Sequence, residues 1–132
     1  MKQQNFEVGR LGEKLAGEYL ERQGYKIIKR NFRTRFGEID LICSHSTRPA
    51  RSGHEVLSFV EVKLKIGEDF GSPEEMIDRK KLRQIEKTAQ SFLIENPIYE
   101  KKYTGFQIDA VCIVLDGTRN VKRITQYENI GF

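Results

Sequence analysis

The residues best suited to chemistry are an acid and an amine inside an apolar stretch, residues 58–65 (SFVEVKLK). Glu61 and Lys63 are separated by one residue, so in a β-strand both side chains point to the same face, about 6.6 Å apart along the chain. An acid-x-Lys triplet alone occurs by chance in many proteins. A further carboxylate, Asp40, interrupts the apolar stretch 37–43 (GEIDLIC) in the same way.

Two carboxylates and one amine on neighbouring strands suggest metal-assisted hydrolysis. A buried unpaired charge is costly, so such groups are neutralised, paired or bound to a metal. Asp40 and Glu61 offer the hard oxygen ligands that Mg²⁺ prefers, and a bound metal lowers the pKa of a water and neutralises phosphate charge. Lys63 would position that water or stabilise charge in the transition state. The structural alternative is a salt bridge from Lys63 to Glu61 or Asp40.

The elements that must position these residues are expected in the order helix, three strands, helix, two strands. Apolar residues at helical spacing predict a helix within residues 5–24 that stops at Gly24. Ser72, Pro73 and Glu75 resemble a capping box, and a longer helix is expected from Asp78 to about Glu95. The expected strands are residues 25–32, 37–43, 56–65, 106–115 and 121–127, with 37–43 and 56–65 antiparallel.

Composition favours one domain spanning residues 1–132. The hydrophobic fraction is 38%, and 23 Lys and Arg residues against 19 acidic ones give a net charge of +4, which permits a polyanionic partner. Neither a signal peptide nor a membrane span is predicted. Cys43 and Cys112 lie in apolar strand-like stretches, so we expect buried free thiols in a reducing cytoplasm.

Four segments together resemble the YraN-like family of the PD-(D/E)XK nuclease superfamily, whose members are similar to archaeal Holliday junction resolvases. They are GEKLAGEYLERQGYKIIKRNFRTRFGEIDLIC, FVEVK, FGSPEEMIDRKKLRQIEKTAQSFL and FQIDAVCI. The resemblance implies an α/β restriction-endonuclease-like core, with a central mixed sheet of about five strands flanked by helices. It also implies an endonuclease dependent on Mg²⁺ or Mn²⁺ that acts on DNA, including branched DNA. Cutting two strands makes a homodimer plausible.

The resemblance assigns roles residue by residue. Asp40 matches the motif Asp, Glu61 and Lys63 match the (D/E)XK pair, and Glu13 matches a helical Glu that completes the acidic cluster. Helical geometry alone does not choose Glu13 over Glu18, because the two border opposite edges of the apolar stripe. Glu13, Asp40 and Glu61 are therefore the expected metal ligands, and Lys63 is the expected catalytic cation.

Two further acids have alternative explanations. Glu38 shares the strand face of Asp40, and either joins the site or pairs with a nearby Arg. Asp109 interrupts the apolar strand at 106–115, and either frames the site or, as we favour, pairs with Arg79 or Lys80 at the start of the second long helix.

Basic residues before Asp40 and along the second long helix are candidates for binding the DNA backbone. The expected contacts are Arg30, Arg33, Arg35, Lys80 and Arg83. A solvated helix face is the common alternative for the last two, which share a face with Lys87.

Two other functions compete with an endonuclease. One is a catalytically silent nucleic-acid- or protein-binding module on a nuclease-like scaffold, and the other is a structural partner in a DNA-uptake or repair assembly. Retention of every motif residue favours the enzyme.

Overall fold

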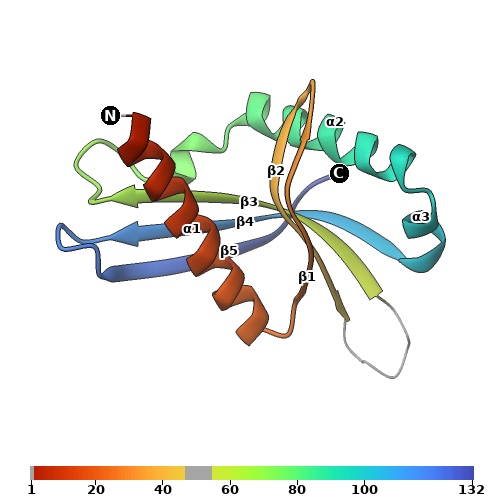
Figure 1. Ribbon diagram of the computed structural model, residues 1–132, viewed down its shortest axis with the longest axis horizontal. Helices are drawn as coiled ribbons and strands as arrows, with labels where there is room; N and C mark the ends of the chain where they lie inside the picture. The colour runs from red at the N-terminus through yellow and green to blue at the C-terminus, as the bar shows by residue number, and fades with distance from the viewer. Residues whose placement is uncertain (1, 47–54) are drawn as a thin grey trace.

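The computed structural model describes residues 2–46 and 55–132, in which five strands form one mixed sheet of order β1-β2-β3-β4-β5 (Figure 1). The strands are β1 Lys26–Thr34, β2 Gly37–Ser46, β3 Glu55–Ile66, β4 Gly105–Leu115 and β5 Val121–Gly131. Neighbouring strands are antiparallel except β3 and β4, which are parallel. The predicted α/β class, with its restriction-endonuclease-like core and five-stranded mixed sheet, is confirmed.

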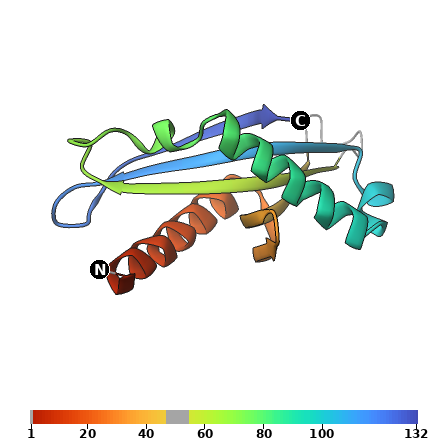
Figure 2. The same cartoon turned by 90° about the horizontal axis from the view of Figure 1, so that it is seen from above.

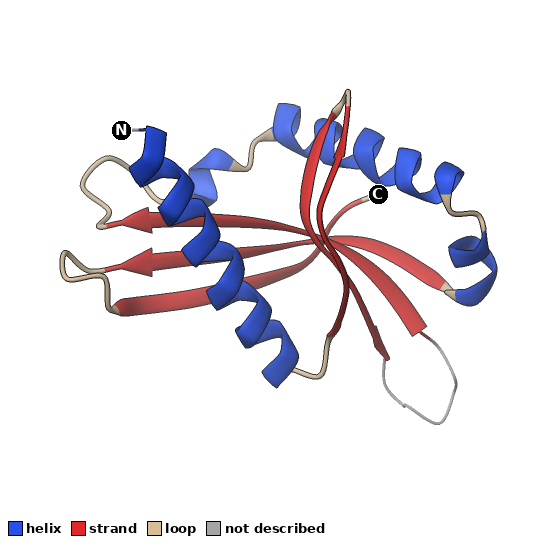
Figure 3. Ribbon diagram, in the orientation of Figure 1, coloured by secondary structure: helices blue, strands red, loops and turns tan. Residues whose placement is uncertain are grey.

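Two long helices, α1 (Lys2–Arg22) and α2 (Arg79–Glu95), cover opposite faces of this sheet (Figures 2 and 3). Phe59 and Ile108 lie in the core beneath α2, whereas Val60 and Val111 lie in the core beneath α1. Alternation along each strand therefore supplies both cores. In the part of the chain that the structure describes, no helix is both long and apolar enough to cross a membrane.

The predicted helix ends are largely correct. Gly24 follows α1 with a φ of +92°, and the Asp78 side chain caps α2 by accepting a hydrogen bond from the Lys81 N–H at 2.8 Å. Pro73, however, begins only a short 3₁₀ turn, η2 (Pro73–Met76), and the Ser72 side chain makes no capping hydrogen bond. A short helix that the sequence did not suggest, α3 (Ile98–Lys102), follows α2. The loop expected between β2 and β3 falls mostly on residues 47–54, outside the described residues.

The β1–β2 hairpin leaves the sheet and rises beside α2 (Figure 1). β2 pairs with β3 only over residues 41–46, whereas its first residues pair with β1 alone. Twist in this free part turns Ile39 into the core beneath α2, although Leu41 lies in the core beneath α1. Strict strand alternation, which predicts that Ile39 and Leu41 share one face, is therefore wrong at this point.

Candidate metal centre

The divergence of β2 from β3 opens a pocket of about 320 Å³. The last paired residues are Leu41 and Val60, so Asp40 and Glu61 are the first residues beyond the ladder on their strands. Residues in the first half of α1, together with Lys81 of α2, also line the pocket. All four residues predicted to be catalytic line it: Glu13, Asp40, Glu61 and Lys63.

Asp40 is held by the backbone of the neighbouring strand. Its Oδ2 accepts a hydrogen bond of 2.8 Å from the Val62 N–H, which has no β2 residue opposite it. Burial, together with a hydrogen bond to Glu61 and the charges of Glu61 and Glu13, raises the pKa of Asp40 well above its ordinary value, while the Val62 bond acts against that rise. The neutral form of Asp40 is therefore favoured in this pocket relative to solution.

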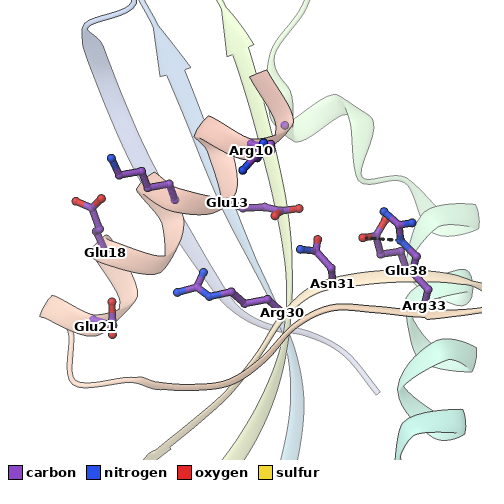
Figure 4. A pocket seen from close by; sticks show the side chains of 10 residues that line it. Arg10, Glu13, Glu18, Glu21, Arg30, Asn31, Arg33 and Glu38 are labelled. Atoms are coloured by element: carbon purple, nitrogen blue, oxygen red, sulfur yellow. Dashed lines mark ion pairs between the residues drawn. The ribbon is translucent and has the colours of Figure 1, made fainter. Parts of the chain in front are cut away.

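Glu13 reaches the pocket because α1 lies very close to β3 at Gly12. A Cβ on Gly12 would stand 3.3 Å from the Cβ of Leu64, so a larger residue would push the helix away. Figure 4 shows the Glu13 side chain extending from α1 toward Asn31, with which it forms a hydrogen bond. Burial raises the Glu13 pKa, and the Asn31 bond opposes the rise. Glu18 lies farther along α1 and is exposed, so docking of the helix selects Glu13.

Glu38 joins the cluster and also pairs with an arginine. Carboxylate oxygens of Glu13, Glu38 and Asp40 all lie within 4.8 Å of one another. Glu38 Oε1 is also 3.3 Å from Arg33 Nε, the ion pair dashed in Figure 4. Both explanations considered for Glu38 thus hold at once. Oxygen atoms at this separation can contact one cation, because Mg²⁺ and Ca²⁺ bind oxygen at roughly 2.0–2.6 Å.

Glu61 has a partner that the sequence did not reveal. Its side chain is 4% exposed, and Oε2 lies 3.1 Å from Lys81 Nζ. Lys63 makes no ion pair within 4.0 Å among the residues described, so the simple Lys63–Glu61 salt bridge is not formed. Glu61 instead contacts the acidic cluster through its hydrogen bond with Asp40. Lys81 could have been suspected only from its place in the first turn of α2, three residues after the capping Asp78.

Comparison with known proteins places the chain in a family. Residues 12–113 match the model described as "Uncharacterised protein family UPF0102". The chain belongs to the UPF0102 family. A UPF0102 protein of Syntrophomonas wolfei is 37% identical over 121 residues, covering 91% of this chain and 96% of that protein. A UPF0102 protein of Persephonella marina is 40% identical over 114 residues, covering 86% and 89% of the two chains.

The basic residues predicted to bind DNA fall into two groups, one on each side of the hairpin of this UPF0102 chain. Arg30 and Arg33 line a pocket of about 750 Å³ between α1 and β1, which shares Glu13 and Glu38 with the acidic pocket (Figure 4). Arg35, Lys80 and Arg83 line a second pocket of about 390 Å³, between the hairpin turn and α2.

Asp109 lies outside the acidic pocket. It accepts hydrogen bonds of 2.9 Å from the Asn129 N–H and from Gln107 Nε2, and a longer one of 3.4 Å from the Tyr25 hydroxyl. These groups, and not Arg79 or Lys80, bind the carboxylate. Asp109 is thus part of a buried network that joins the ends of β1, β4 and β5.

Proposed function

We propose that this UPF0102 chain is a metal-dependent endonuclease that hydrolyses phosphodiester bonds in DNA. The observation that carries the proposal is the cluster of Glu13, Glu38 and Asp40, whose carboxylate oxygens lie within 4.8 Å of one another in a pocket also lined by Lys63. The resemblance of Asp40, Glu61 and Lys63 to the PD-(D/E)XK motif supports the same chemistry.

The donor set fits Mg²⁺ or Mn²⁺, because every candidate ligand is a carboxylate oxygen. Glu13, Glu38 and Asp40 would hold the cation, which would offset the burial and the carboxylate repulsion that raise the Asp40 pKa. When bound, such a cation neutralises phosphate charge and lowers the pKa of the attacking water. Glu61 would bind at the edge of this set, through its contact with Asp40.

The remaining residues have positioning and charge-stabilising roles. Lys63 lines the pocket, and its ammonium group would stabilise the charge that develops on the phosphate oxygens. Lys81 neutralises Glu61 and so holds it beside Asp40. The basic residues on both sides of the hairpin would hold the DNA backbone in register.

The decisive experiment is cleavage of labelled linear, flap and four-way DNA with Mg²⁺ or Mn²⁺. Asp40→Asn and Lys63→Ala should each lower the rate by about 100-fold or more. Asp69→Asn and Lys65→Ala are matched controls: Asp69 is exposed, and Lys65 follows Lys63 on the same strand face but contacts the Phe70 carbonyl. Equal losses in the controls, or no effect of Asp40→Asn and Lys63→Ala, would contradict the proposal.

A second candidate is a binding module without catalysis. It is favoured by the basic pocket at the hairpin turn, which has none of the acidic residues among its lining. Binding of every DNA substrate with cleavage of none would support it.

If instead Asp40→Asn and Lys63→Ala changed only the Tm, the acidic pocket would stabilise the fold, and the protein would act as a structural partner.

A further inference from the structure

The turn of the β1–β2 hairpin presents an arginine and an aromatic ring together. Arg35 and Phe36 lie between the end of β1 and the start of β2, and the Phe36 N–H donates to Thr34 Oγ1 at 3.1 Å. The Arg35 guanidinium carbon lies 5.0 Å from the centre of the Phe36 ring. Phe36 remains 38% exposed, so the turn offers a flat apolar surface with a cation stacked on it.

This turn is fixed against α2 and is not a free loop. Gly37 has a φ of +152°, and a Cβ there would come within 2.8 Å of the Gln84 side chain. The positive φ favours glycine here, and the missing Cβ leaves room for the Gln84 side chain. Gln84 Oε1 also accepts a hydrogen bond of 3.5 Å from Lys81 Nζ, and Lys81 pairs with Glu61. The turn is therefore linked to the acidic pocket through α2.

The pocket between the turn and α2 is strongly basic. Its lining consists of Arg35, Phe36, Lys80, Arg83, Gln84 and Lys87. Lys80, Arg83, Gln84 and Lys87 follow the i, i+3, i+4, i+7 spacing of one helix face. The pocket has four cations, Arg35, Lys80, Arg83 and Lys87. Within the described part of the chain, none of them makes an ion pair within 4.0 Å. An uncompensated cluster of this kind attracts a polyanion.

Phe36 and Asp40 lie on one hairpin, four residues apart, which is about 13 Å at roughly 3.3 Å per residue. This distance equals roughly four nucleotides along a duplex strand. A DNA strand cut at the acidic pocket can therefore extend to the hairpin turn. At that point it meets a stacking surface beside four cations, which is the combination that binds unpaired nucleotides.

We propose that the hairpin turn binds unpaired nucleotides next to the cleavage site, with a base stacked on Phe36 and the phosphates on Lys80, Arg83 and Lys87. This inference rests on the proposed nuclease function and specifies its substrate. The preferred DNA contains an unstacked or single-stranded segment, as at a flap or branch point. A fully paired duplex uses the cations but leaves Phe36 without a base.

The test is equilibrium binding in EDTA, where cleavage does not interfere. The probes are a fluorescein-labelled oligothymidine, a four-way junction and a linear duplex of the same arm sequence. Phe36→Ala should weaken oligothymidine and junction binding by about five- to tenfold and duplex binding by less than about twofold. Phe36→Trp should retain the preference, which separates stacking from any change in folding. Phe70→Ala is the control, because Phe70 is 96% exposed in another loop.

The charge contribution is tested with Lys80→Glu/Arg83→Glu against Lys101→Glu/Lys102→Glu on α3. The first pair should weaken binding of all three probes and reduce its salt dependence, and the second pair should not. Equal effects of Phe36→Ala on duplex and unpaired probes, or none, would overturn the stacking proposal. These outcomes are independent of the proposed nuclease activity, whose failure appears as absent cleavage with Mg²⁺ or Mn²⁺.

Discussion

Asp40 takes the place of a strand partner for Val62. The Val62 N–H donates to Asp40 Oδ2 at 2.8 Å just beyond Leu41 and Val60, the last paired residues of β2 and β3. The side chain that closes the ladder is also a member of the acidic cluster. This one carboxyl group should therefore affect both the stability of the fold and the proposed cleavage. A substitution can separate the two effects.

Asp40→Asn should stabilise the protein in EDTA while abolishing cleavage. The folded-state pKa of Asp40 is raised, so near neutral pH ionisation is less favourable in the fold than in the unfolded chain. Asparagine removes that penalty, and its amide oxygen still accepts the Val62 hydrogen bond. We expect a gain of about 1–2 kcal/mol and a Tm a few degrees higher, measured by thermal denaturation.

The matched control is Asp69→Asn, because the Asp69 carboxylate is exposed. This substitution should change the free energy of unfolding by less than about 0.5 kcal/mol. A lower Tm for Asp40→Asn in EDTA would mean that its carboxylate is more stable ionised than neutral in this pocket.

The main strands of the site could be predicted from sequence, whereas the identity of the third acid could not. Period-two alternation places Glu61 and Lys63 on one face regardless of tertiary context. Alternation also places Glu38 on the face of Asp40, but it could not show that Glu13 of α1 lies beside both, because that depends on where the helix packs. The sequence signal for a close approach of α1 near Glu13 is the small size of Gly12 and Ala16, and both residues are buried in the structure.

Metal binding by variants can show whether Glu38 or Glu61 is the third ligand. Binding of Mn²⁺, followed by titration calorimetry, should weaken about tenfold or more in Glu38→Gln, because its oxygen lies with those of Glu13 and Asp40. Glu61→Gln should weaken binding less, since Glu61 is already paired with Lys81. Glu75→Gln, an exposed acid on η2, is the control. The reverse order of effects would assign the third ligand to Glu61.

Lys81→Met should destabilise the fold by about 1–3 kcal/mol, because it leaves the 4%-exposed Glu61 without its nearest cation. Lys80→Met removes the neighbouring exposed charge and should have little effect. Adding Glu61→Gln to Lys81→Met should recover most of the loss, and the double-mutant cycle by urea denaturation measures this coupling. Additive losses in the cycle would show that the 3.1 Å contact contributes nothing.

An arginine on β5 secures the η2 turn that borders the acidic pocket. Arg123 Nη1 and Nη2 lie 2.8 and 2.9 Å from the two oxygens of Glu74, and the Tyr127 hydroxyl donates to Glu74 Oε2 at 2.7 Å. The Arg123 hydrogen bonds lower the Glu74 pKa from 4.5 to about 2, with a smaller contribution from Tyr127. Met76 of the same turn lines the acidic pocket.

Because the folded-state pKa of Glu74 is depressed, its stabilising effect is complete above about pH 4.5 and is lost as the pH falls toward about 2. Glu74→Gln should therefore lower the Tm near neutral pH, and the gap between wild type and variant should narrow near pH 3. Glu75→Gln, an exposed neighbour, should shift neither value. A gap that stays constant across this pH range would show that Glu74 acts through neutral hydrogen bonds, because only its ionised form gains from the Arg123 charge.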